Sequence, residues 1–169
     1  FGGNVEDIKM ARVNNTPILR KDFMIDAYQF YEAKAIGADV ILLIAACLTQ
    51  QQVKEFASLS KQLGLEVLLE IHNEEELAHI CDEVDFVGVN NRNLKTFEVD
   101  INTSLQLFPH IPVEKPAIAE SGIGSVDTIV TLKQAGFKGF LIGENFMKSS
   151  DPAASFESFS TELKSRTVK

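Results

Sequence analysis

Short apolar runs alternate with longer amphipathic segments along the whole chain. The runs are rich in Val, Ile, Leu, Phe and Ala, which is typical of parallel strands that are covered on both faces. Six such runs are predicted as strands, at residues 17–21, 39–44, 66–70, 85–90, 116–120 and 139–143. The pattern therefore predicts a sheet with helices packed around it.

Helix-capping patterns stand between these runs. Thr49 with Gln52 forms a capping box, and Asn73 with Glu76 repeats it. Asp151-Pro152 is typical of the N-cap and first position of a final helix. The helix after Thr49 is expected to pack through an apolar stripe of Val53, Phe56, Leu59 and Leu63. One helix followed by six β–α units predicts a parallel sheet with right-handed crossovers.

Two α/β architectures fit this order: an open doubly wound sheet and a (β/α)8 TIM barrel. A dinucleotide-binding sheet requires G-x-G-x-x-G after a strand, and "GIG" at 122–124 is too short for it. The barrel is therefore favoured, although a complete one needs about 250 residues. Residues 1–169 are predicted to form a single domain, an incomplete TIM barrel without its first two strands. Because the chain begins with Phe1 rather than Met, we expect it to be a piece of a longer protein.

Composition narrows the classes of partner. Sixteen Lys and Arg residues and 24 Asp and Glu residues give a net charge of −8, which argues against nucleic acid and anionic membranes. A small anion remains compatible, because a few backbone N–H groups can bind one phosphate. Cys47 and Cys81 lie in apolar stretches and are expected to be small core residues. With no signal-like apolar segment, a cytoplasmic location is expected.

Polar groups follow five of the six predicted strands. These groups are Lys21-Asp22, Glu70, Asn90-Asn91-Arg92, Glu120-Ser121-Gly122 and Gly143-Glu144-Asn145, whereas the second strand ends in the apolar Ile44-Ala45-Ala46. A single polar residue at a strand end usually faces water. In a barrel, however, the carboxyl ends of all strands meet at one mouth, where active sites lie. The series therefore predicts a functional site.

The chemistry of these residues favours acid–base catalysis on a phosphorylated molecule. Lys21 can donate a proton to a developing alkoxide, while a carboxylate such as Glu70 removes or returns one. Ser121-Gly122 and the segment 142–145 fall where (β/α)8 barrels often bind phosphate, although they also suit ordinary turns. His72 is interpreted as a loop or cap residue, and no His, Asp or Glu cluster has metal-ligand spacing.

Six segments together resemble a known family. "PILRKDF", "ADVILLI", "LLEIHNEEEL", "VGVNNRNL", "IAESGI" and "FLIGENFM" are similar to the third to eighth strand segments of indole-3-glycerol-phosphate synthase, a (β/α)8 enzyme of tryptophan biosynthesis. The resemblance implies a carboxy-lyase that converts 1-(2-carboxyphenylamino)-1-deoxyribulose 5-phosphate into indole-3-glycerol phosphate. Ring closure, decarboxylation and dehydration would proceed without a metal or organic cofactor.

The resemblance also implies roles for individual residues. The catalytic group would consist of Lys21 as general acid, Glu70 as acid–base residue, Asn90 and Glu120. The substrate would be bound by Phe23 and Leu42 around its aromatic ring and by Arg92 and Ser121. The phosphate would be bound by Ser121, Gly122, Gly143 and Glu144.

Part of the family pattern is absent. The family's first strand carries a further Glu–Lys pair in an "E-x-K-x-x-S-P-S"-like motif, which this sequence lacks. We therefore expect the 169-residue chain alone to be inactive, and its exposed sheet edges to allow self-association. The alternatives are another phosphate-binding barrel, such as phosphoribosylanthranilate isomerase or a tryptophan synthase alpha subunit, a non-catalytic phosphate-binding fragment, and a structural scaffold.

Overall fold

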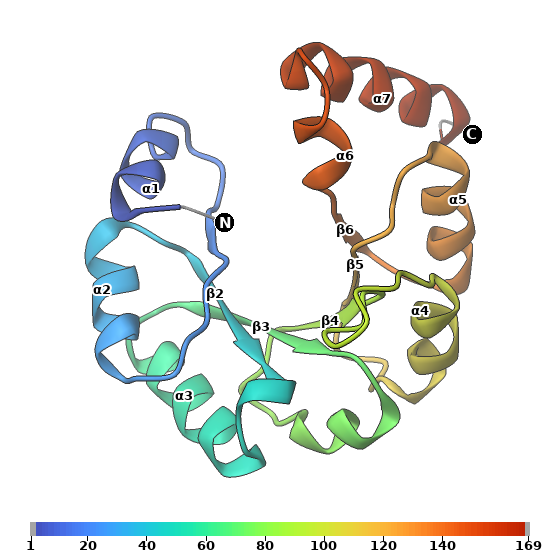
Figure 1. Ribbon diagram of the computed structural model, residues 1–169. Coiled ribbons are helices and arrows are strands. Elements are labelled where there is room, and N and C mark those ends of the chain that lie inside the picture. The colour runs from blue at the N-terminus through green and yellow to red at the C-terminus, as the bar shows by residue number, and fades with distance from the viewer. Residues whose placement is uncertain (1–2, 168–169) are drawn as a thin grey trace. The chain divides into compact units, whose positions relative to one another are not determined.

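The computed structural model describes residues 3–167, so Phe1 lies outside the described residues (Figure 1). Its strands are β1 (Leu19–Arg20), β2 (Val40–Ile44), β3 (Glu66–Ile71), β4 (Phe86–Asn90), β5 (Ala117–Glu120) and β6 (Gly139–Leu141). They stand in one sheet in sequence order. All six predicted strands are confirmed, although β1 and β6 are shorter than the apolar runs that predicted them.

Helices follow the strands along the chain. The α-helices are α1 (Val5–Ala11), α2 (Tyr28–Ile36), α3 (Gln50–Gln62), α4 (Asn102–Leu107), α5 (Val126–Ala135), α6 (Glu144–Met147) and α7 (Pro152–Thr167). Three short 3-10 helices are η1 (Ala45–Cys47), η2 (Glu74–His79) and η3 (Phe108–His110). This alternation of strands and helices is the predicted order.

The predicted caps are largely confirmed. Thr49 and Gln52 form a reciprocal capping box at the start of α3, and the Asp151 carboxylate accepts a hydrogen bond from the backbone N–H of Ala154 at 3.0 Å. Asn73 also caps its element, but that element is the 3-10 helix η2. There the Glu76 carboxylate accepts a hydrogen bond from the backbone N–H of His72 at 2.7 Å. This bond takes the place of the one from the backbone N–H of Asn73 that a capping box would contain.

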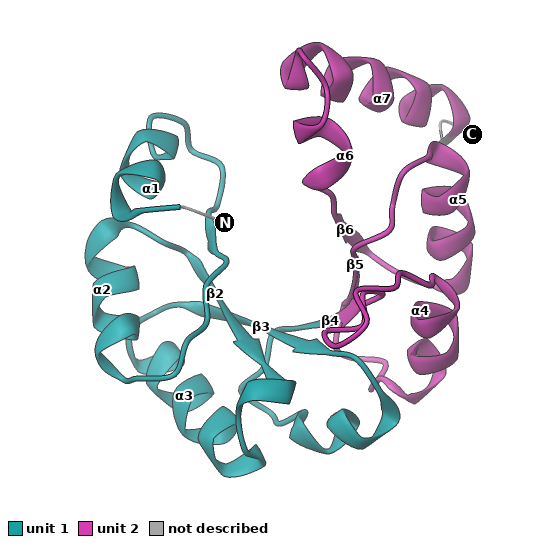
Figure 2. Cartoon of the chain, in the orientation of Figure 1, with its two compact units in different colours: residues 1–87 teal, residues 88–169 magenta. Residues whose placement is uncertain are grey.

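Contacts divide the chain into two compact units, residues 1–87 and 88–169, with the boundary inside β4 (Figure 2). In unit 1, β2 pairs in parallel with both β1 and β3, and Ile44 lies opposite Glu70. Phe30 of α2 and Phe56 of α3 pack with their ring centroids 4.9 Å apart. Unit 1 therefore has its own core of helices against parallel strands. The single domain predicted for residues 1–169 stays a prediction.

Two details of unit 1 differ from the sequence interpretation. The buried positions of α3 are Val53, Ala57 and Ser60, while the other residues of the predicted stripe are half-buried. Cys47 is exposed rather than a core residue, and Cys81 is half-buried. The apolar run continues past the end of β2 into η1, where the chain leaves the core, so the run alone overstated the burial of Cys47.

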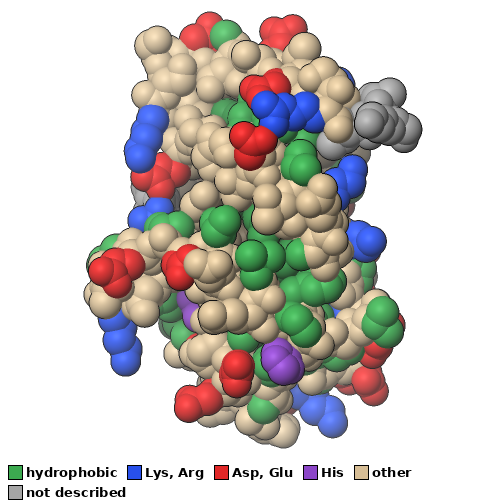
Figure 3. All heavy atoms as spheres, turned by 90° about the vertical axis from the view of Figure 1, so that its right-hand side faces the viewer, with side chains coloured by type: hydrophobic (Ala, Val, Ile, Leu, Met, Phe, Trp, Pro, Cys, Tyr) green, Lys and Arg blue, Asp and Glu red, His purple; other side chains and the backbone are tan. Residues whose placement is uncertain are grey.

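In unit 2, β5 and β6 pair in parallel, with Ala119 opposite Phe140. Phe108 and Phe137 pack at a centroid distance of 5.0 Å. Gly136, at φ +123°, ends α5, and a Cβ there would come within 2.2 Å of the Phe108 ring. Figure 3 shows the outer side of this unit, where hydrophobic side chains lie among charged ones.

Candidate active site

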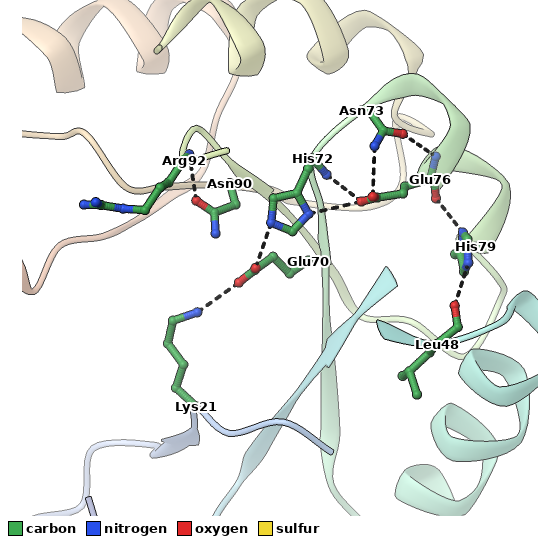
Figure 4. Close-up of polar contacts among 9 residues, drawn as sticks. All are labelled: Lys21, Leu48, Glu70, His72, Asn73, Glu76, His79, Asn90 and Arg92. Carbon is green, nitrogen blue, oxygen red and sulfur yellow. Dashed lines mark hydrogen bonds and ion pairs between the residues drawn. The ribbon is translucent and has the colours of Figure 1, made fainter. Parts of the chain in front are cut away.

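The ends of β1 and β3 in unit 1 bring a lysine and a glutamate together. The Nζ atom of Lys21 lies 3.0 Å from Oε2 of Glu70 (Figure 4). Glu70 is 2% exposed, whereas the side chain of Lys21 is half exposed. Five consecutive buried residues end β3, so the sheet itself carries the Glu70 carboxylate into a water-poor position. A buried carboxylate beside an ammonium group can exchange a proton with it.

His72 extends this ion pair into a chain of charges. Its Nε2 atom lies 3.2 Å from Oε1 of Glu70, and its Nδ1 atom lies 3.1 Å from Oε2 of Glu76. Burial would lower the pKa of His72, but its contacts with the two carboxylates raise that pKa to about 9. The imidazole is therefore a cation at neutral pH, and both oxygens of Glu70 face a positively charged nitrogen.

The sequence interpretation placed His72 in a loop, which is correct for its backbone. It did not predict the contacts that the His72 side chain makes with Glu70 and Glu76. The residue does follow β3, and its N–H is bonded by Glu76. The signal that could have revealed its contacts is the spacing Glu70-x-His72, because alternate residues of an extended chain point to the same side. His79 is different, because its ring nitrogens lie near the carbonyl oxygens of Glu76 and Leu48, which indicates a structural role.

Three other residues of unit 1 lie in or after the strands β1 and β2. Leu42 is 2% exposed within β2, and Phe23 is exposed after β1. Partial burial and the charges of Glu70 and Glu76 raise the pKa of the Cys47 thiol. The negative charges of Glu70 and Glu76 therefore act on Cys47. They keep its thiol protonated at neutral pH.

In unit 2, the polar residues after β4 meet the residues after β6. The side-chain oxygen of Asn90 accepts a hydrogen bond from the backbone of Arg92 at 3.0 Å, and the Arg92 guanidinium forms an ion pair with Glu144. Lys148 lies 2.6 Å from the same carboxylate. Its hydrogen bond and charge, together with those of Arg92, lower the pKa of Glu144. Two cations thus offset the negative charge of the Glu144 carboxylate.

The turn after β5 has an unusual backbone. Glu120 ends the strand and is 1% exposed, and Ser121 and Gly122 follow with φ angles of +65° and +71°. A Cβ on Gly122 would come within 2.3 Å of the Val99 side chain. At Gly143, by contrast, a Cβ would meet no atom of the described residues within 4 Å. Gly122 is therefore required by the fold, whereas local packing does not require glycine at Gly143.

The structure thus assembles the predicted site residues as two groups, each within its own unit. Lys21 and Glu70 touch in unit 1, while Arg92 and Glu144 touch in unit 2. Whether these groups meet at one mouth stays a prediction of the barrel architecture. Among residues 3–167, no three His, Cys, Asp or Glu side chains are grouped to hold a metal ion. Within the same residues, no helix is long and apolar enough to cross a membrane.

Comparison with protein families identifies the relatives of the chain. The model of the indole-3-glycerol phosphate synthase family matches residues 1–159. The indole-3-glycerol phosphate synthase of Bacteroides thetaiotaomicron is 49% identical over 160 residues, which are 94% of this chain and 62% of that protein. The synthase of Variovorax paradoxus is 45% identical over 90% of this chain and 58% of its own length. The chain thus spans about three fifths of the length of these relatives.

Solved structures show the fold. A tryptophan synthase complex from Pyrococcus furiosus contains a chain that matches 97% of this one with a TM-score of 0.72 at 20% identity. The alpha subunit of the same enzyme matches with a TM-score of 0.73, also at 20% identity, over 75% of its length. At this identity the likeness concerns the fold alone, and it confirms the predicted incomplete (β/α) barrel.

Proposed function

The chain belongs to the indole-3-glycerol phosphate synthase family, and we propose that the protein it represents forms indole-3-glycerol phosphate. The substrate would be 1-(2-carboxyphenylamino)-1-deoxyribulose 5-phosphate, which loses carbon dioxide and water as its second ring closes. The observation that carries this proposal is the family match over residues 1–159. The pair of the half-exposed Lys21 and the buried Glu70, 3.0 Å apart, supports it with the acid–base groups that the chemistry needs.

Ring closure requires a proton at the ketone oxygen. As the aromatic carbon attacks the ketone carbon, charge develops on that oxygen, and protonation by a nearby acid lowers the barrier. Lys21 is the acid in this proposal, because it is a cation whose side chain is half exposed at the end of β1. Glu70 stabilises the charged lysine before the transfer and can return a proton to it afterwards. Loss of carbon dioxide then restores the aromatic ring.

Dehydration requires two further proton transfers. The leaving hydroxyl group takes a proton, and the neighbouring carbon loses one as the new double bond forms. Two groups that exchange protons over 3.0 Å fit this demand, because one can act as acid while the other acts as base. Glu120, which is buried at the end of β5, is the second carboxylate in the proposal.

The phosphate end of the substrate is assigned to unit 2. Ser121 offers a hydroxyl, and glycine at Gly122 and Gly143 lets backbone N–H groups come close to an anion. Arg92 supplies a positive charge, and Asn90 an amide, to orient the molecule. Phe23 and Leu42 are assigned to the aromatic ring of the substrate. The proposed partners are therefore small phosphorylated molecules rather than nucleic acid or membrane, in a cytoplasmic location.

The proposal is tested by turnover, using the protein at the full length at which it is encoded. Purified protein free of host synthase is mixed with the substrate, and the indole product is followed by its fluorescence. Product formation is expected, together with its loss in Lys21→Ala. Turnover of phosphoribosylanthranilate instead would favour the isomerase alternative, and product binding without turnover would favour a non-catalytic protein.

The 169-residue chain by itself is a separate case. Because it spans about three fifths of its relatives and lacks the motif with the further Glu–Lys pair, we expect no turnover from this polypeptide. Binding of the product can persist, since the residues assigned to the phosphate are present. Measurable turnover by the purified chain would contradict this expectation.

A further inference from the structure

We propose that Asn91 is a positioning residue that sets the backbone of the Glu120–Ser121–Gly122 turn for anion binding. This inference rests on the proposed phosphate-binding role of Ser121 and Gly122. Asn91 follows β4 directly and is 2% exposed. It therefore acts through the residues that it holds rather than by touching a ligand.

Both N–H groups of the Asn91 side chain are used on this turn. Its Nδ2 atom donates to the carbonyl oxygens of Glu120 and Ser121, at 3.1 Å each. The backbone N–H of Asn91 donates to the Glu120 carbonyl as well, at 2.9 Å. One buried residue thus makes three hydrogen bonds to two consecutive peptide groups. Those peptide groups join the proposed catalytic carboxylate to the proposed phosphate contacts.

The acceptor side of the same amide fixes its orientation. The Oδ1 atom of Asn91 accepts from the backbone N–H of Ser104 at 3.1 Å and from its hydroxyl at 2.8 Å. All four hydrogen-bonding positions of the amide are thereby satisfied, so the group cannot turn without losing bonds inside the protein. Ser104 is itself completely buried in α4.

The held conformation is one that serine rarely adopts. A side chain at φ +65° costs free energy, because its Cβ crowds the carbonyl group. The hydrogen bond from Asn91 to the Ser121 carbonyl offsets this cost. Without the bond, Ser121 would relax toward negative φ, and its N–H and that of Gly122 would change direction.

A second contact, with Val99, limits the conformation of the turn. Val99 pairs with Arg92 as an antiparallel bridge, and its side chain occupies the space where a Cβ of Gly122 would stand. The segment after β4 therefore contacts the turn in two ways, because Asn91 donates hydrogen bonds to it and Val99 packs against it. Asn91 and Val99 belong to the same segment after β4. That segment therefore determines the direction in which the N–H group of Gly122 points.

The test uses the protein at its full encoded length, labelled with 15N, and inorganic phosphate as the probe. Phosphate is expected to shift the amide signals of Ser121 and Gly122 in the wild-type protein. Asn91→Asp keeps the size and the acceptor but replaces the donor with an oxygen that repels two carbonyl groups. It is expected to weaken phosphate binding roughly tenfold, the effect of one good hydrogen bond to an ion.

Ser104→Ala is the matched control. It removes a buried hydrogen bond to the same amide while leaving both Nδ2 bonds in place. We expect a loss of thermal stability that is smaller than that of Asn91→Asp, because only one bond is lost and no charge is buried, and a phosphate affinity within about twofold of wild type. Equal loss of affinity in the two variants would show that Asn91 is only structural and would overturn the proposal.

A double-mutant cycle tests the mechanism itself. Glycine adopts positive φ without strain, so Asn91→Asp should weaken binding less in a Ser121→Gly background than in wild type. If Asn91→Asp does not fold, Asn91→Ser takes its place in the same cycle. Additive effects, or unchanged affinity in a folded Asn91 variant, would overturn the proposal.

The two proposals fail separately. A wild-type protein that turns over substrate but shows no phosphate shift at Ser121 and Gly122 would overturn the positioning role while leaving the synthase function standing. Phosphate binding with the expected dependence on Asn91, but without turnover, would support the positioning role and contradict the synthase function.

Discussion

The two units carry polar strand ends that are built in opposite ways. In unit 1, charged side chains contact one another in a chain from Lys21 through Glu70 and His72 to Glu76. In unit 2, the turn after β5 is held through its main chain by the neutral amide of Asn91. The first arrangement depends on protonation, and the second on backbone conformation. Substitutions that change charge and substitutions that change shape should therefore affect the two units differently.

The largest expected effect concerns charge in unit 1. Glu70→Gln keeps the shape of the side chain but removes the carboxylate between Lys21 and His72, so it can no longer exchange protons. Turnover is expected to fall by about 10²–10⁴-fold, the usual contribution of a general acid or base. The measurement is kcat for the protein at its full encoded length.

Glu66→Gln supplies the control for this experiment. Glu66 is exposed at the opposite end of the same strand, so the substitution makes the same chemical change away from the site. It should leave kcat unchanged. Similar losses in the two variants would mean that the charge of β3, rather than the position of Glu70, governs activity.

A smaller effect concerns the pH dependence of stability. The pKa of His72 is about 9 in the folded protein and near 6.5 in an unfolded chain, so the folded state binds the proton more tightly. The resulting stabilisation is complete below pH 6.5 and is lost as the pH rises through 9. It amounts to at most about 3 kcal/mol. Chemical unfolding of wild type and His72→Gln between pH 6 and 10 measures it.

The His72 variant should show a flatter profile over that range. His110→Gln, at an exposed position of η3, should keep the wild-type profile. If the free energies of unfolding of wild type and His72→Gln fall in parallel between pH 6.5 and 9, the charge of His72 does not stabilise the fold.

The smallest effect concerns shape in unit 2. Gly122→Ala introduces a methyl group at φ +71° and 2.3 Å from Val99, and should lower the free energy of unfolding by about 2 kcal/mol. Gly143→Ala has open space around it and a negative φ, so stability should hardly change. Thermal unfolding of the two variants provides the comparison. Equal destabilisation would contradict the difference between the two glycines.

Much of the fold could be predicted because its signals are local. Strand β2 is a continuous apolar run, and the Thr49 box uses residues three apart, so neither needs knowledge of distant contacts. The same locality explains the errors. Asn73 and Glu76 match a capping box, but Glu76 is drawn to His72, which a pattern of cap residues does not include.

The sequence predicted which residues of the candidate site lie at strand ends. It predicted less well which of their side chains contact one another. The strand ends identified Lys21 and Glu70, which do touch. Asn91 stood in the same polar group, yet its importance comes from Ser104 and Ser121, which are 13 and 30 residues away in sequence. Neighbours at that distance are brought together by packing, and no periodicity within a short window can reveal them.

Two of the hydrogen bonds accepted by the Glu76 carboxylate have a consequence for how the protein can vary. One oxygen accepts from both the backbone N–H and the ring of His72. The backbone bond does not depend on which side chain residue 72 carries, so the loop keeps its anchor when that side chain is exchanged. The residue at position 72 can therefore change through evolution or by design without remodelling the loop. One substitution there would change the pH range over which Glu70 and Glu76 have a cation between them.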